Sequence, residues 1–252
     1  MNRRVQRRSS RSAAVYIPIG VLLIILLTVF GTSGFLRIVE IEVDGSLTYT
    51  NDEIIKASGI SYGDHLLFLD GKAAARRIEQ AMPFINGATV SRIPPGGVRI
   101  EVTESIAIAY IDIYGEALVI DSSGRVLEVV TFAPDGLIEL RGFNPGDSIM
   151  GSKLKAMQGG EYQMGIMLDV LSAFEKERME GYVSYLDVTY ITQIEFFYKN
   201  NYRVVLGQPN NLREKLNKLP EAIAEVEAKY PDGATGTLKA EQSGKWVWTL
   251  DN

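Results

Sequence analysis

The stretch VEIEVDGSLTYTNDEIIKASGISYGDHLLFLD, residues 39–70, sets the order of the first folded elements. Apolar and acidic residues alternate at its start, which is the pattern of a half-buried strand. The apolar positions of this expected strand are Val39, Ile41 and Val43. Thr50 and Glu53 have the spacing of a capping box, so a helix is expected to begin there. Gly59 is placed to end it, because glycine readily adopts the left-handed backbone of a helix C-cap.

A second helix and a hairpin are expected next, the hairpin in MPFINGATVSRIPPGGVRIEVTES, residues 82–105. Asp70 can cap the helix, and Pro83 marks its expected end. The hairpin strands are expected at 88–93 and 98–103, because the PPGG sequence between them cannot continue a helix or a central strand. The order strand, helix, helix, strand, strand predicts a small α+β domain.

An apolar run at the N-terminus predicts one membrane span over residues 13–36. No acidic residue precedes Glu40, and about 20 helical residues cross a hydrocarbon core of roughly 30 Å. Five arginines lie ahead of the run, at positions 3, 4, 7, 8 and 11. This bias predicts a cytoplasmic N-terminus and an exported C-terminal part. A cleaved signal peptide ending near 31–34 is the alternative, and it exports the same domain.

Composition narrows the chemistry of the exported part. The chain has a formal charge of −5, which becomes −10 without the five N-terminal arginines, so a nucleic-acid ligand is disfavoured. The absence of cysteine excludes disulfides and thiolate chemistry. The one histidine, His65, excludes a site with several histidine ligands and is expected to make a loop hydrogen bond. We therefore expect no cofactor, no metal and no catalytic residues.

A second, β-rich domain is expected after the first. ALVIDSSGRVLEV, residues 117–129, predicts two strands joined by a tight turn from Asp121 to Gly124. Further on, helical spacing predicts a helix that contains 166–174 and stops at Gly181, and another over 211–230 that Pro220 kinks or splits. Strands are expected at 182–188, 193–198 and 202–206, with a tight turn at Asn200-Asn201, as an antiparallel meander.

The chain closes with an expected hairpin that turns at Ser243-Gly244. Trp246 and Trp248 share one face of its last strand. Two interpretations stay open for them, namely packing beneath the helix above and an exposed anchor for a partner.

The element order of residues 37–105 resembles a POTRA domain. The motifs narrow the resemblance to the FtsQ and DivIB family of bacterial cell division proteins, because VEIEVDG, TNDEI, PFINGATVSRIPP and IEVTE occur in the family's order. The resemblance implies four segments: a cytoplasmic tail at 1–12, a transmembrane helix at 13–36, the POTRA-like domain at 37–105 and a β domain at 106–252. It also implies a single-pass protein of the bacterial cell membrane that gathers at the division septum.

The resemblance further implies a non-enzymatic divisome scaffold. Its expected partners are FtsL and DivIC or FtsB, single-span division proteins, with septal penicillin-binding proteins as further candidates, and it would help control septal peptidoglycan synthesis. In the family the partner adds a strand near the C-terminal end of the β domain. The positions implied here as partner-binding are Tyr230, Leu238, Lys239, Ala240, Glu241, Trp246 and Trp248.

Two other functions remain as alternatives. A membrane-anchored or secreted cell-wall hydrolase would need a pair of carboxylates about 5 to 10 Å apart, which the abundant acidic residues could supply. A polypeptide-transport role would use the POTRA-like fold but would end in a membrane barrel, and the repeated strands of about ten residues that a barrel needs are missing. The scaffold is favoured because no phosphate loop or nucleophile elbow occurs.

Overall fold

The structure is a computed structural model. The residues that it describes are 13–32, 36–230, 235–241 and 245–250. The basic tail expected at 1–12 and the turn expected at Ser243-Gly244 lie outside them. The described residues form two compact units. Unit 1 reaches Ile78 and includes 87–102, and unit 2 holds 79–86 and the residues from Thr103 onward.

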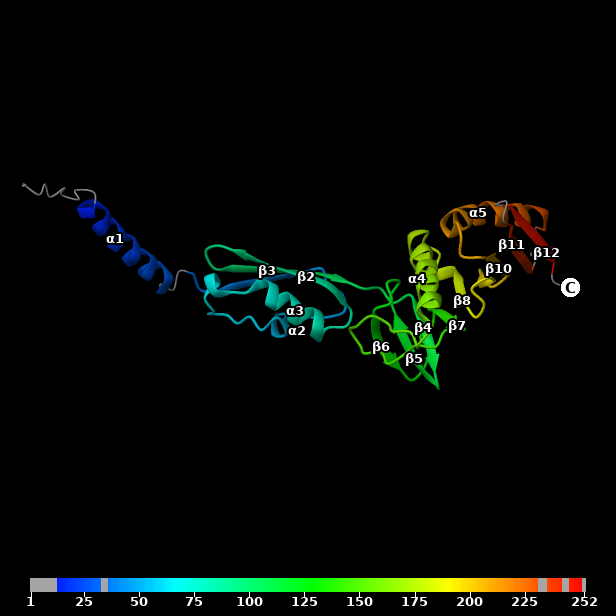
Figure 1. The fold of residues 1–252 in the computed structure, drawn as a ribbon, viewed down its shortest axis with the longest axis horizontal. Coiled ribbons are helices and arrows are strands. Elements are labelled where there is room, and N and C mark those ends of the chain that lie inside the picture. The colour runs from blue at the N-terminus through cyan, green and yellow to red at the C-terminus, as the bar shows by residue number, and fades with distance from the viewer. Residues whose placement is uncertain (1–12, 33–35, 231–234, 242–244, 251–252) are drawn as a thin grey trace, which may run out of the picture. The chain divides into compact units, whose positions relative to one another are not determined.

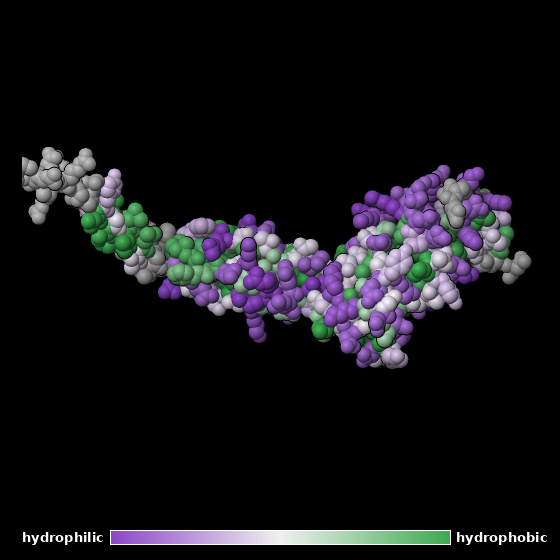
Figure 2. Space-filling view, in the orientation of Figure 1, coloured by the Kyte–Doolittle hydropathy of each residue, from purple (hydrophilic) through white to green (hydrophobic). Residues whose placement is uncertain are grey.

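The first element of unit 1 is α1, Ala13–Thr32, a continuous helix that contains Pro18. Its apolar side chains from Tyr16 to Leu27 are 47–71 % exposed, and Figure 2 shows the hydrophobic surface that they form. Within the described residues, no helix combines the length and the hydropathy that a membrane crossing needs. The transmembrane helix expected at 13–36 therefore stays a prediction.

The rest of unit 1 is a three-stranded sheet with helices on one face (Figure 1). Its elements are β1 (Glu40–Asp44), α2 (Asn51–Ser58), the short 3-10 helix η2 (Leu66–Phe68), α3 (Gly71–Ala81), β2 (Ile85–Ile93) and β3 (Gly97–Glu104). The ends of α3 and β3 and the start of β2 are counted with unit 2. β3 is central and parallel to β1, with β2 on its other side. The predicted order of strand, helix, helix, strand and strand is confirmed.

Local sequence signals explain why the helices of unit 1 begin and end where they do. The Thr50 hydroxyl accepts a hydrogen bond from Glu53 N, and the Glu53 carboxylate accepts one from Thr50 N at 2.9 Å. These bonds from Thr50 lower the pKa of Glu53. Gly59 ends α2 with φ of 68°, and Asp70 caps α3 by accepting from Ala73 N at 3.0 Å. The capping box and both caps predicted from the sequence are confirmed.

Two expectations for unit 1 need correction. Val39 was expected on the buried face of the first strand, but it precedes β1 and is 74 % exposed. Pairing of β1 begins only at Glu40, opposite Gly97, so the alternation of burial does not extend back to residue 39. β2 also begins at Ile85, three residues earlier than expected, and Ile85 is fully buried.

Unit 2 is built on one nine-stranded sheet. Its strands are β4 (Ala109–Ile113), β5 (Glu116–Ile120), β6 (Val126–Val130), β7 (Ile138–Arg141), β8 (Val183–Asp187), β9 (Ile194–Tyr198), β10 (Tyr202–Gly207), β11 (Gly236–Ala240) and β12 (Trp246–Leu250). Their order across the sheet is β12-β11-β10-β9-β8-β7-β4-β5-β6. Its helices are α4 (Glu161–Lys176), the short 3-10 helix η3 (Glu180–Tyr182) and α5 (Leu212–Lys229).

The core of unit 2 lies between the sheet and the two long helices (Figure 1). α4 contributes five buried side chains, Ile166, Met167, Val170, Leu171 and Phe174. α5 contributes the apolar Leu216, Leu219, Ile223 and Val226. Both sets match the helical spacing read from the sequence, so the prediction that helices cover one face of the sheet is confirmed.

Connections within unit 2 include features that the sequence did not reveal. β7 lies between β4 and β8 and is parallel to both. β11 is parallel to β10, with α5 as the crossover between them. β8, β9 and β10 form the predicted antiparallel meander.

The ends of three elements differ from the expectation. α4 stops at Lys176 instead of continuing to Gly181, because Arg178 has a left-handed φ of 55°. The β9–β10 turn places its positive φ angles at Lys199 and Asn200, one residue earlier than Asn200-Asn201. α5 runs unbroken through Pro220, so the proline does not split it.

Candidate functional site

The C-terminal strand β12 forms one border of the unit 2 sheet. In the described part of the chain its one strand neighbour is β11. At the opposite border, β6 is partly covered, because Val126 N donates to Ser152 O at 2.9 Å and Gly151 N donates to Val126 O at 2.8 Å. A border strand with unpaired backbone groups is a template for another polypeptide strand. β12 is therefore the candidate edge.

The hairpin register shows which groups of β12 face outward. Glu241 N donates to Lys245 O at 2.8 Å, and bonded and non-bonded pairs alternate along an antiparallel ladder. The pair of Lys239 and Val247 therefore exchanges hydrogen bonds within the hairpin. The backbone groups of the alternate β12 residues point to the open edge. These residues are Trp246, Trp248 and Leu250.

A cleft of about 600 Å³ lies beside this edge, where β10 leaves the sheet toward α5. Its lining side chains include Thr192, Gln208, Lys239, Glu241 and Val247. The cleft combines both charge signs with an apolar wall. Its chemistry suits a polypeptide segment that carries both polar and apolar side chains.

Lys215 holds one wall of the cleft in place. Its side chain is almost fully buried, and its ammonium donates to Leu206 O at 2.8 Å, Gln208 O at 2.8 Å and the side-chain oxygen of Asn210 at 3.0 Å. All three acceptors are neutral, and burial lowers the pKa of Lys215. The lysine thereby fixes the loop from β10 to α5. No sequence motif pointed to it, since a lone lysine on a helix is ordinarily solvated.

Replacing Lys215 with alanine should lower the free energy of unfolding by about 2–3 kcal/mol, because buried carbonyls lose a charged donor. Lys218→Ala is the matched control on the same helix. Lys218 forms an exposed pair with Glu214 at 2.8 Å, and such i,i+4 pairs contribute about 0.3–0.5 kcal/mol. Denaturant unfolding of the two variants measures the difference. Equal losses would contradict a structural role for Lys215.

The seven positions implied by the family resemblance do not all lie at one surface. Lys239, Ala240 and Glu241 line the cleft. Leu238 is buried in the core, and Tyr230, Trp246 and Trp248 pack against that core. Trp248 makes an edge contact with Tyr202, with ring centroids 5.8 Å apart. The structure therefore places both tryptophans on the helix-covered face, while Val247 and Thr249 lie on the exposed one.

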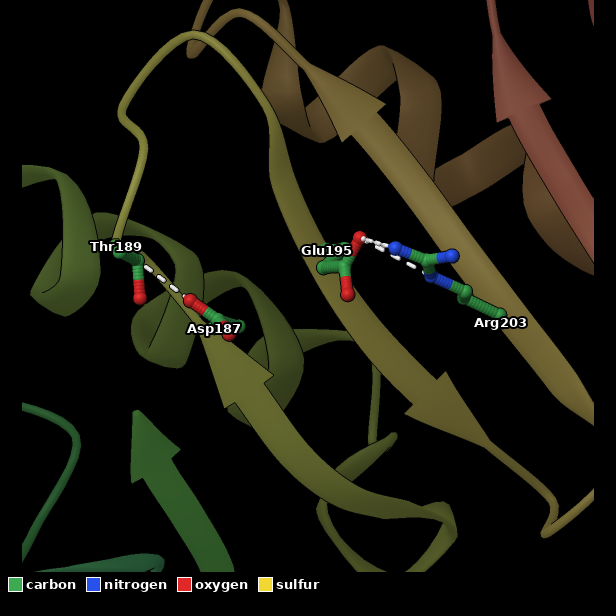
Figure 3. Close-up of polar contacts among 4 residues, drawn as sticks. All are labelled: Asp187, Thr189, Glu195 and Arg203. Atoms are coloured by element: carbon green, nitrogen blue, oxygen red, sulfur yellow. Dashed lines mark hydrogen bonds and ion pairs between the residues drawn. The ribbon is translucent and has the colours of Figure 1, made fainter. Parts of the chain in front are cut away.

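The face of the sheet opposite the helices carries paired charges. Arg203 binds Glu195 across β9 and β10 at 2.6 Å, and the Asp187 carboxylate accepts from Thr189 N at 2.8 Å (Figure 3). Arg141 lies 4.0 Å from the ring centre of Tyr185. Partial burial, followed by the charge of Glu195, raises the pKa of Tyr185.

The same face also carries a stacked aromatic pair. The rings of Tyr185 and Phe197 are 5.9 Å apart and nearly parallel, and the Arg141 guanidinium binds Glu139 at 2.6 Å. Each of the two arginines is paired with a glutamate, so the positive charges on this face are balanced within it.

Two polar side chains elsewhere, Asp121 and His65, fix loops through hydrogen bonds to the backbone. Asp121 accepts from the Ser105 hydroxyl at 2.6 Å, from Ser123 N at 2.9 Å and from Arg125 N at 2.8 Å, which fixes the predicted turn to Gly124. His65 Nδ1 accepts from Leu67 N at 3.4 Å and so caps η2, as its expected loop role required. Among the described residues, no group of three or more His, Cys, Asp or Glu side chains could hold a metal ion.

Comparison with known proteins finds a family model that matches part of the chain. Residues 36–105 match the POTRA domain of FtsQ type. The chain is 24 % identical to cell division protein DivIB of Clostridium tetani over 198 residues, which is 78 % of this chain and 73 % of the relative. It is 27 % identical to cell division protein FtsQ of Corynebacterium glutamicum, covering 63 % of this chain and 74 % of that one. It is 24 % identical to DivIB of Clostridium botulinum, covering 90 % and 87 %.

An FtsQ-type POTRA domain followed by a β-rich unit defines the class of protein to which this chain is similar. Within that class, the chain is related to the FtsQ and DivIB cell division proteins. The family resemblance predicted from the motifs is confirmed.

Proposed function

We propose that this protein is a non-enzymatic scaffold of the bacterial division machinery. The relationship to proteins named for cell division supports a role in that process. The open edge of β12 is the observation that carries the scaffold role, because it offers backbone groups on which a partner can form a strand. The cleft beside that edge offers side-chain contacts to the same partner.

The partners proposed are the single-span division proteins DivIC or FtsB, together with FtsL. The external segment of DivIC or FtsB would extend the sheet at β12 and place side chains against Lys239, Glu241 and Val247 in the cleft. Recruitment of these proteins, and of septal penicillin-binding proteins with them, would help control septal peptidoglycan synthesis. No cofactor or small-molecule substrate takes part.

We propose that α1 anchors the protein in the cell membrane with its N-terminus in the cytoplasm. The exposed apolar side chains from Tyr16 to Leu27 support this, since burial in lipid would remove them from water. The five arginines ahead of the helix favour the cytoplasmic side. The domain limits proposed are 37–105 for the POTRA domain and 106–252 for the β domain, and the FtsQ-type match at 36–105 supports the first.

Depletion of the protein in its host tests the cell-division role. Cells should grow as filaments with few completed septa, and the full chain expressed from a second copy should restore division. Normal septation after depletion would contradict the proposal.

The hydrolase alternative is tested separately by incubating the purified full chain with peptidoglycan. Release of muropeptides would favour an enzyme over a scaffold.

A further inference from the structure

We propose that one end of unit 1 docks onto the lipid surface through an apolar patch formed by Val39, Tyr62, Leu67 and Phe68. This inference rests on the proposed anchoring by α1. The exposed fractions of the four side chains are 74, 62, 52 and 81 % in that order. Figure 2 shows hydrophobic side chains gathered at the end of unit 1 where the β2–β3 turn lies. Exposure of several large apolar side chains together marks an interaction surface.

Backbone hydrogen bonds hold the segments of the patch together. Ile38 N donates to Asp64 O at 2.8 Å, and Gly63 N donates to Ile38 O at 2.8 Å, so residues 37–39 run beside residues 63–65. Val39 N donates to Gly96 O at 2.9 Å, which places the patch beside the β2–β3 turn. The four side chains therefore belong to one end of the unit, at the start of β1 and β3.

Two arginines fix the loop that carries most of the patch. Arg37 donates from its guanidinium to Gly63 O at 2.7 Å, and Arg92 donates to Leu69 O. The His65 ring lies 4.9 Å from the Phe68 ring. These contacts support the loop while its apolar side chains stay exposed, and both arginines are exposed beside it.

The short connection to α1 indicates that lipid is what the apolar patch contacts. Five residue steps separate Thr32 from Arg37, and an extended chain spans at most about 3.6 Å per step, so this end of unit 1 lies within roughly 18 Å of the end of α1. The interfacial layer of a bilayer is about 5–8 Å thick on each side. With α1 inserted, the patch is held next to that layer.

The composition of the patch fits the interfacial layer. Tyrosine and other aromatic side chains are favoured at the level of the lipid headgroups, where one end of the side chain is apolar and the other meets water. Arg37 and Arg92 lie where they can meet lipid phosphates. Such docking would fix the height and the tilt of the three-stranded sheet of unit 1 above the membrane.

The chain has no cysteine, so single cysteines can be labelled without background. We suggest spin labels at Phe68→Cys and at Leu47→Cys in the full chain, reconstituted with one protein per lipid nanodisc. Leu47 is the matched control because it is 99 % exposed, apolar and in the same unit, but lies beyond the other end of β1. Collision with a water-soluble nickel chelate should be several-fold less frequent at position 68 than at position 47.

A third label, at Leu23→Cys within α1, separates the two proposals. Protection at position 23 together with full chelate access at position 68 would overturn lipid docking while leaving the anchor intact. Full access at both positions would overturn the anchor as well. Protection at 23 and 68 with access at 47 is the expected result, and it also excludes a second protein copy as the cover because each disc holds one chain.

Discussion

Replacing Phe196 with alanine should lower the free energy of unfolding of unit 2 by about 4 kcal/mol, the range for truncating a fully buried aromatic side chain. Phe196 in β9 has no exposed surface. Its ring meets Phe174 of α4 at 4.9 Å and Tyr198 at 6.4 Å, both edge to face. Alanine would leave a cavity between the sheet and the helix, which the surrounding strands cannot close without moving.

Phe197→Ala is the matched control for this variant. Phe197 is the next residue of the same strand, but its side chain is half-buried on the opposite face, stacked on Tyr185. Its loss should cost about 1 kcal/mol. Denaturant unfolding followed by tryptophan fluorescence reports on unit 2 directly, because the two tryptophans of the chain lie in β12. Equal losses for both variants would contradict the assignment of the core to the helix-covered face.

Local chemistry is the part of this fold that the sequence predicts well. The capping box of Thr50 and Glu53, the cap at Asp70 and the turn at Gly124 each depend on residues within a few positions of one another. Signals of this kind are legible without knowledge of the tertiary structure.

The sheet order of unit 2 could not be predicted in the same way. β7 is four residues long and pairs in parallel with both β4 and β8, so its place depends on contacts far along the chain. The sequence predicts the helix α5, but it does not predict that this helix connects two parallel strands. A periodic pattern shows which face an element buries, but it does not show which elements lie next to it.

The partner-binding role of the terminal hairpin stays a prediction, and the structure shows where its side chains lie. The terminal hairpin lies at the sheet border, as edge pairing requires. The side chains divide between the cleft and the core, because alternate residues of a strand face opposite sides. The sequence does not predict the role of Lys215, because its burial results from the loop that it binds. The exposure of the apolar patch in unit 1 could not be predicted from the sequence either. Val39 continues the apolar alternation of β1 but lies outside the residues that pair with β3.

Replacing Leu250 with proline should weaken capture of the DivIC external segment by roughly tenfold. The N–H of Leu250 points to the open edge, so proline removes a donor offered to the partner without taking one from β11. Loss of one net hydrogen bond costs about 1 kcal/mol, and the clash of the proline ring with an incoming strand adds to it. Binding of the full chain to the purified segment gives the dissociation constant.

Proline at Lys239 or Val247 would be a poorer test, because these two residues bond to each other across the hairpin and their loss would disrupt the folded edge itself. Leu250→Ala is the matched control, since it shortens the same side chain, which is 46 % exposed, but keeps the backbone donor. Strand addition requires the proline variant to bind more weakly than the alanine variant while both unfold at similar denaturant concentrations. Equal affinities would exclude backbone pairing at β12 and would leave the cleft side chains as the basis of recognition.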